Sequence, residues 1–296
     1  MHRRDFLGAI TAAPLAAATT MQGGFSEFQI ACMTLPYNAF PVERAIEGIA
    51  KAGYKYLVFG SRHQGGDTIA EDAPPSKMRD MAQRARDAGT EPLMMFGVHY
   101  MEKPDAVDVY KRRIEQAAAG RLPYLLAFGS PSDPPTDYGI WVRHLKALGP
   151  MARAAGVTLV IKQHGGNTDT GRECARMLSE VADESVRMFY DGGNTWFYPN
   201  IDPIPDIASC APYIRGIVIK DFRHIPQRTT CGPGFGEIDH YQLLAPVAHT
   251  GRKMPLACET IWEPYTARPD TPGKVDALAR RTREYLEAVV AGLKAL

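Results

Sequence analysis

The sequence predicts a single α/β domain, a closed (β/α)8 or TIM barrel, that runs from residue 25 to residue 296. Short apolar runs alternate with amphipathic segments along this length, which is the order of elements in a barrel of parallel strands. Three amphipathic segments end in Ala-Gly just before the next apolar run, at Gly53, Gly89 and Gly156, as expected where a left-handed glycine closes a helix. An open doubly wound sheet is the alternative, but no GxGxxG follows the first apolar run.

The predicted strands are runs of β-favouring residues without polar alternation, a pattern typical of strands covered on both faces. In chain order they are 28–33, 56–59, 92–98, 124–128, 157–161, 186–190, 214–219 and 254–258. The predicted helices are 42–52, 76–88, 104–119, 138–155, 170–181, 203–210, 239–249 and 272–296. Thr170 and Asp239 stand where a side-chain oxygen would cap the free amides of the helix that follows.

The N-terminus predicts an export signal. Arg3 and Arg4 stand before a hydrophobic pair and a mildly apolar, alanine-rich run that ends at Ala18, a pattern that resembles the twin-arginine signal. A disordered basic tail is the alternative. We therefore divide the chain into a signal and linker, 1–24, and a barrel, 25–296. We expect export to the periplasm or another extracytoplasmic compartment, with no membrane attachment once the signal is removed.

Composition limits the classes of partner. The formal net charge of +1 offers no electrostatic reason to expect nucleic acid or an anionic membrane, so a small neutral or weakly anionic ligand is expected. The five cysteines are scattered without CxxC spacing, which predicts buried thiols rather than a zinc site or a disulfide framework.

The stretch GVTLVIKQHGGN, residues 156–167, points to the functional site. Its apolar run ends directly in Lys162, Gln163 and His164, and charge at the end of a buried strand is costly unless it faces a cavity, a partner or a ligand. In a barrel the C-terminal ends of all strands meet at one mouth, so residues distant in sequence converge there. The predicted mouth also collects Phe59, His63, His99, Phe128, Asp191, Asn194, Lys220, Asp221, Glu259 and Trp262.

Five motifs at strand ends follow one another in the chain: LVIKQHGGN, FYDGGN, IVIKD, GPGFGEID and LACE. In this order, over residues 28–296, they resemble the xylose isomerase-like barrel superfamily of sugar phosphate isomerases and epimerases. The resemblance implies proton transfer next to a carbonyl and one divalent metal, Mn, Mg or Zn. Its ligands would be a glutamate, an aspartate, a histidine and a glutamate from strands five to eight. Asp191 and Glu259 match the aspartate and the last glutamate, whereas Lys162 and Val218 stand at the other two positions.

Lys162 reverses the sign of charge at one of these positions, and an ammonium has no lone pair for a metal. We expect the Lys162 ammonium in the place of the cation, held between Asp191 and Glu259, with Lys220 as a second positive charge. Such a cluster is either a structural ion-pair network or a working site, because a lysine with a perturbed pKa acts as acid, base or nucleophile. A metal held by His164, Asp191 and Glu259 is a third alternative.

The function expected from these residues is that of an isomerase, epimerase or lyase acting on a sugar or polyol, with non-catalytic carbohydrate binding as the alternative. We assign Glu259 as base, Lys162 as stabiliser of an enediolate or proton donor, Asp191 as the residue that orients Lys162, and His164 as a substrate contact. Further substrate contacts are expected from His63, His99, Asn194, Lys220 and Trp262. A homodimer is one assembly that the sequence allows.

Overall fold

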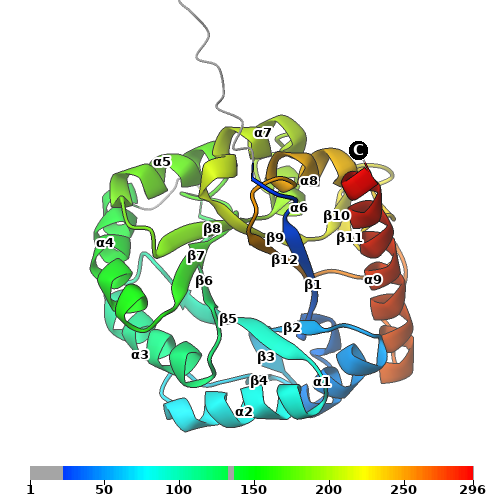
Figure 1. The fold of residues 1–296 in the computed structure, drawn as a ribbon, viewed down its shortest axis with the longest axis horizontal. Coiled ribbons are helices and arrows are strands. Elements are labelled where there is room, and N and C mark those ends of the chain that lie inside the picture. The colour runs from blue at the N-terminus through cyan, green and yellow to red at the C-terminus, as the bar shows by residue number, and fades with distance from the viewer. Residues whose placement is uncertain (1–22, 133–136, 296) are drawn as a thin grey trace, which may run out of the picture.

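The computed structural model describes residues 23–132 and 137–295, and these form a closed barrel of parallel strands surrounded by helices (Figure 1). Around the barrel the strands are β1 (Glu27–Met33), β12 (Lys253–Cys258), β9 (Ile214–Ile219), β8 (Val186–Tyr190), β7 (Thr158–Ile161), β6 (Tyr124–Phe128), β5 (Glu91–Tyr100) and β2 (Tyr56–Phe59). Each pairs in parallel with the next, and β1 closes the ring on β2. The predicted (β/α)8 fold is confirmed. Residues 1–22, which carry the predicted twin-arginine motif, lie outside the described residues.

The helices form the outer layer of the barrel, as Figure 1 shows. They are α1 (Val42–Lys51), α2 (Pro75–Asp87), α3 (Ala106–Ala119), α4 (Tyr138–Ala154), α5 (Gly171–Val181), α6 (Gly192–Phe197), α7 (Pro203–Cys210), α8 (His240–Leu244) and α9 (Pro272–Ala295). None of the helices in the described part of the chain combines the length and the apolar character needed to cross a membrane.

Local sequence signals explain where several helices begin and end. Gly53, Gly89 and Gly156 have φ of 88°, 88° and 68°, so each predicted left-handed helix end is confirmed. Thr170 forms the capping box of α5: its side chain accepts from the Glu173 amide at 3.1 Å, and the Glu173 carboxylate accepts from the Thr170 amide.

The structure differs from the prediction mainly in the loops at the mouth. The predicted helix 239–249 ends at Leu244 and continues as a 3-10 turn (Ala245–Val247), because Pro246 has no amide hydrogen to extend an α-helix. The sequence pattern also did not predict α6 directly after Asp191, or the small hairpins that pair β3 (Arg62–His63) with β4 (Gly66–Asp67) and β10 (Asp221–Arg223) with β11 (Thr229–Cys231).

The barrel interior is a packed apolar core rather than a pore. Val160, Phe189, Val218 and Ala257 lie in it, one from each of β7, β8, β9 and β12, and all are buried. Since side chains two positions apart in a strand share a face, the residues two positions further along lie above this core at the C-terminal mouth. Outside the barrel, between strands and helices, lies a second and larger core that takes in Cys32, Cys174, Cys210 and Cys258. All five cysteines are buried and free, as predicted.

Candidate functional site

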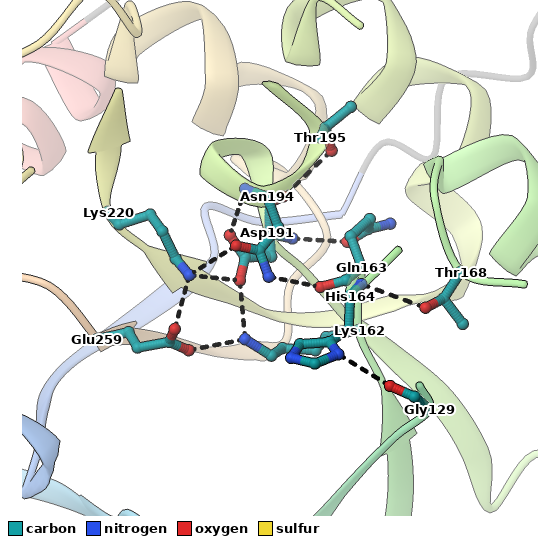
Figure 2. Close-up of polar contacts among 10 residues, drawn as sticks. All are labelled: Gly129, Lys162, Gln163, His164, Thr168, Asp191, Asn194, Thr195, Lys220 and Glu259. Atoms are coloured by element: carbon teal, nitrogen blue, oxygen red, sulfur yellow. Dashed lines mark hydrogen bonds and ion pairs between the residues drawn. The ribbon is translucent and has the colours of Figure 1, made fainter. Parts of the chain in front are cut away.

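Four charged side chains stand at the mouth above the apolar interior. Lys162, Asp191, Lys220 and Glu259 directly follow β7, β8, β9 and β12, which are neighbours in the barrel. Each comes two residues after an inward-facing residue of the interior core. Strand alternation alone therefore points all four side chains toward the barrel axis. Figure 2 shows them pointing toward one another.

These side chains form a ring in which cations and anions alternate, and we call it the lysine–carboxylate ring. The Lys162 nitrogen lies 3.0 Å from Asp191 Oδ2 and 2.8 Å from Glu259 Oε2, as expected from the sequence. The Lys220 nitrogen lies 2.6 Å from Glu259 Oε1 and 3.1 Å from Asp191 Oδ2 (Figure 2). Two positive and two negative charges cancel, which makes their burial tolerable.

The ring favours the charged forms of Lys162 and Glu259. The side chains of Lys162, Lys220 and Asp191 are at most 4% exposed and that of Glu259 is 17% exposed. Burial disfavours charge on Lys162, but the charges of Glu259 and Asp191 outweigh it and raise the pKa of Lys162. Burial likewise disfavours charge on Glu259, yet Lys162 and Lys220 lower the pKa of this carboxyl well below its usual range. A carboxylate with such a pKa accepts a proton poorly at neutral pH.

Counting donors distinguishes the two lysines, since an ammonium has three N–H groups. The Lys220 nitrogen faces three oxygens, because Asn194 Oδ1 lies 3.0 Å away in addition to Glu259 and Asp191. Lys162 donates to only two oxygens among the described residues. One N–H of Lys162 therefore remains for a bound molecule.

Gln163 and α6 hold this arrangement in place. Asp191 Oδ1 accepts from the Asn194 amide at 3.0 Å and so caps the first turn of α6, which leaves Oδ2 for the lysines. The Gln163 side chain accepts from the Asp191 amide at 2.7 Å, and its backbone carbonyl accepts from the Asn194 side chain at 2.7 Å. Asn194, predicted as a substrate contact, thus also positions Lys220.

A cavity of about 210 Å³ opens beside the ring. Its walls come from the ring, from aromatic side chains and from the loop after β2: Ser61, Phe96, Phe128, Lys162, His164, Asn194, Tyr198 and Glu259. We call it the ring cavity. Small polar ligands with an apolar face, such as sugars, fit a wall that combines aromatic rings with a few fixed polar groups.

His164 supplies the ring cavity with a proton acceptor. Its Nδ1 lies 2.8 Å from the Gly129 carbonyl, which can only accept, so Nδ1 carries the hydrogen. Burial is the main cause that lowers the pKa of His164, and the positive charge of Lys162 is the second. The His164 imidazole is therefore neutral at pH 7. In that tautomer Nε2 bears a lone pair, and no hydrogen-bond partner of Nε2 is present within the described residues.

His63 and His99 do not line the ring cavity. His63 Nδ1 contacts the Phe40 carbonyl at 3.0 Å. His99 lies between Glu71 and Asp105, with ring nitrogens 3.1 Å and 2.9 Å from their carboxylates. Val98 has φ of 62° and the register of β5 shifts after Phe96, which breaks strand alternation before His99. The prediction from strand ends assumed regular alternation, so it did not foresee this orientation.

Trp262 lines a second cavity, which shares Glu259 with the first. Sequence reasoning did not select Ser61 or Phe96 as cavity residues. Phe96 belongs to the apolar interior core and lies inside a predicted strand rather than at its end. A search restricted to strand ends therefore misses it, although alternation within β5 would have placed it inward.

The residues present do not fit a divalent metal. Both carboxylates of the ring already accept from ammonium groups, and a cation would meet two like charges. Val218, at the implied histidine position, is buried in the apolar core below Lys220. Within residues 23–132 and 137–295, no three histidine, cysteine or acidic side chains gather so as to hold a metal ion. The candidate set of His164, Asp191 and Glu259 is therefore not such a group.

Comparisons with known proteins agree with the fold. The family model for the "Xylose isomerase-like TIM barrel" matches residues 46–288. A xylose isomerase domain protein from Planctomyces limnophilus has a TM-score of 0.71 at 15% identity, covering 92% of this chain and 99% of that one. A D-psicose 3-epimerase, solved in the presence of D-fructose, has a TM-score of 0.69 at 14% identity, covering 88% and 99%.

A xylose isomerase-like protein from Mycobacterium smegmatis, solved in complex with magnesium, has a TM-score of 0.68 at 15% identity and covers 90% of this chain and 97% of that one. At such identities the likeness shows the fold alone. No curated protein gives a significant sequence match.

Proposed function

This chain belongs to the xylose isomerase-like TIM barrel family, and we propose that it moves a proton on the carbon next to the carbonyl of a small sugar. In this proposal the Lys162 ammonium takes the place of a divalent ion. The observation that carries this proposal is that Lys162 and His164 line the same cavity. Lys162 has one N–H without an acceptor among the described residues, and the neutral His164 has a free lone pair on Nε2.

The proposed reaction assigns one role to each of these groups. The substrate carbonyl accepts the free N–H of Lys162, and the same hydrogen bond strengthens as negative charge builds on that oxygen in the enolate. His164 Nε2 takes the proton from the neighbouring carbon and becomes an imidazolium, which then returns it. Return of this proton to the former carbonyl carbon, while the proton of the hydroxyl on the first carbon passes to the former carbonyl oxygen, is isomerisation. Epimerisation at the first carbon instead requires water or a second acid to deliver a proton to the opposite face.

The pKa shifts favour this division of roles over the one expected from the sequence. A raised pKa makes Lys162 a poor proton donor but a permanent cation, so it acts as the electrostatic stabiliser. The lowered pKa of Glu259 makes this carboxylate a poor base, so we move that role to His164. Glu259 and Asp191 then serve to hold the two lysines.

A second candidate function is carbohydrate binding without turnover. The observation that favours it is that all four charges of the ring satisfy one another, as in a purely structural ion-pair network. The two functions differ in whether the carbon next to the carbonyl exchanges its hydrogen.

Deuterium incorporation tests the proposal. The protein is incubated in deuterium oxide with a panel of aldoses, keto-sugars and oxidised glycosides, and exchange is followed by NMR. We expect at least one sugar to exchange, and His164→Asn to slow that exchange by roughly a hundredfold or more. His144→Asn is the matched control, because His144 also donates from Nδ1 to a backbone carbonyl, that of Met101, at 2.8 Å. Binding of sugars without any exchange would instead establish the second candidate.

A further inference from the structure

Beside the ring cavity lies a larger one, of about 390 Å³, which we call the tryptophan cavity. It is formed by the loops that follow β1 and β12: Leu35, Pro36, Asn38, Ala39, Phe40, Glu259, Thr260, Trp262, Arg268 and Pro269. Glu259 lies in the walls of both cavities. We propose that the tryptophan cavity binds an anionic group of the substrate, a carboxylate or a phosphate, through Arg268. This inference rests on the proposed function only in taking the reacting end of the substrate to lie at Lys162.

The Arg268 guanidinium contacts an aromatic ring but no oxygen among the described residues. Its guanidinium lies 4.2 Å from the centre of the Trp262 ring. Within residues 23–132 and 137–295 it donates no hydrogen bond and forms no ion pair. Three other arginines that follow β9 in the chain instead donate to backbone carbonyls: Arg223 at 2.7 Å, Arg228 at 3.0 Å and Arg281 at 2.8 Å.

The wall of the tryptophan cavity holds one cation, Arg268, and one anion, Glu259, whose charge is already matched within the lysine–carboxylate ring. Glu259 is the acidic residue in its wall, and both of its oxygens already accept from lysines. Glu263 and Asp270 line an adjoining cavity together with Arg268, but neither forms an ion pair with it in the described part of the chain, and Asp270 is bound to Lys274 at 2.8 Å. Arg268 is exposed at the edge of the cavity, and partial desolvation lowers its pKa with no acidic partner among the described residues to offset it.

Arg268 is chemically suited to an anion. A guanidinium held over an indole ring still has its N–H groups available for paired hydrogen bonds to a carboxylate or phosphate. Because the two cavities share Glu259 in their walls, one substrate can place its carbonyl at Lys162 and its anionic group at Arg268. The geometry thus favours a sugar acid or a sugar phosphate over a neutral sugar.

Binding measurements test this inference without relying on turnover. Calorimetric titrations with D-glucuronate, D-glucose 6-phosphate and D-glucose compare the wild type with Arg268→Gln, Arg268→Lys and Arg79→Gln. The last is a matched control, because Arg79 is an exposed arginine on α2, 3.8 Å from Asp80 and outside both cavities. We expect at least one anion to bind more tightly than glucose, and Arg268→Gln to weaken that anion by tenfold or more while leaving glucose unchanged.

The arms of the experiment separate the sources of the anion and the two proposals. Tighter binding of glucuronate identifies a carboxylate, and tighter binding of glucose 6-phosphate identifies a phosphate. Arg268→Lys is expected to recover only part of the affinity, since a lysine lacks the planar fork. Equal binding of glucose and both anions, or anion binding that Arg268→Gln leaves unchanged, would overturn the inference. Anion binding that depends on Arg268, in a protein that exchanges no deuterium into any sugar, would support this inference while refuting the proposed function.

Discussion

Replacing Lys162 with methionine tests the lysine–carboxylate ring most sharply, because methionine is also unbranched and only one atom shorter, and it removes the charge. The substitution leaves Glu259 Oε2 without a donor and leaves Asp191 Oδ2 with Lys220 alone. Removing one partner of a buried ion pair costs about 3–5 kcal/mol, and the 17% exposure of Glu259 favours the lower end, about 3 kcal/mol. We therefore expect the free energy of unfolding at pH 7 to fall by about 3 kcal/mol.

The loss should depend on pH in a defined direction. The lowered pKa of Glu259 stabilises the fold above the ordinary glutamate pKa of about 4.3, and this contribution is lost as pH falls toward the folded pKa. The raised pKa of Lys162 stabilises the fold below the ordinary lysine pKa of about 10.4, and that contribution is lost as pH rises toward the folded pKa. The difference in the free energy of unfolding between wild type and Lys162→Met should thus be constant from about pH 5 to about pH 10. It should become smaller at lower and at higher pH.

Urea unfolding of wild type, Lys162→Met, Glu259→Gln and the double variant across this pH range measures the free energies of unfolding. The double variant should be less destabilised than the sum of the single ones, because it removes the unpaired carboxylate. Lys274→Met is the matched control, because Lys274 pairs with Asp270 at the surface, where both side chains are more than half exposed. This substitution should lower the free energy of unfolding by less than about 1 kcal/mol. A Lys162→Met loss no larger than that of Lys274→Met would refute the reasoning.

Three further predictions concern other parts of the account. Because the lowered pKa of His164 keeps its imidazole neutral, deuterium exchange should persist below pH 6.5 and decline only in more acid buffer. A loss of exchange on acidification that is centred above pH 7 would contradict this. Because Lys220 and not Val218 points into the ring, the double change Lys162→Glu and Lys220→His should create binding of Mn²⁺ that calorimetry detects and the wild type lacks; failure to bind would argue against a metal site at this mouth. Replacing Arg3 and Arg4 by lysine should abolish export of a fused reporter, whereas unchanged export would indicate another route.

Much of the fold was predictable because its signals are local. A left-handed glycine at Gly156 and a capping box at Thr170 act within a few residues, so the sequence pattern determines them. The positions of Lys162, Asp191 and Glu259 also follow from strand alternation, which held on β7, β8 and β12.

The rest of the site depends on features that alternation does not encode. The positive φ of Val98 sends His99 to Glu71 and Asp105, away from the ring cavity. Asn194 Oδ1, on a short helix that the sequence pattern did not predict, accepts from Lys220 and not from Lys162. Lys162 is therefore the lysine that keeps a free N–H. Such contacts between distant residues are set by tertiary packing, which no local pattern specifies.

The measurement that tests the central claim most directly is the rate of deuterium exchange on a substrate, for wild type and Lys162→Met, after dialysis against a chelator and again with added Mn²⁺. If the Lys162 ammonium replaces a divalent ion, the chelated wild type should exchange at its full rate, added Mn²⁺ should not raise it, and Lys162→Met should lose it. Exchange that disappears on chelation, returns with Mn²⁺ and survives in Lys162→Met would contradict the account.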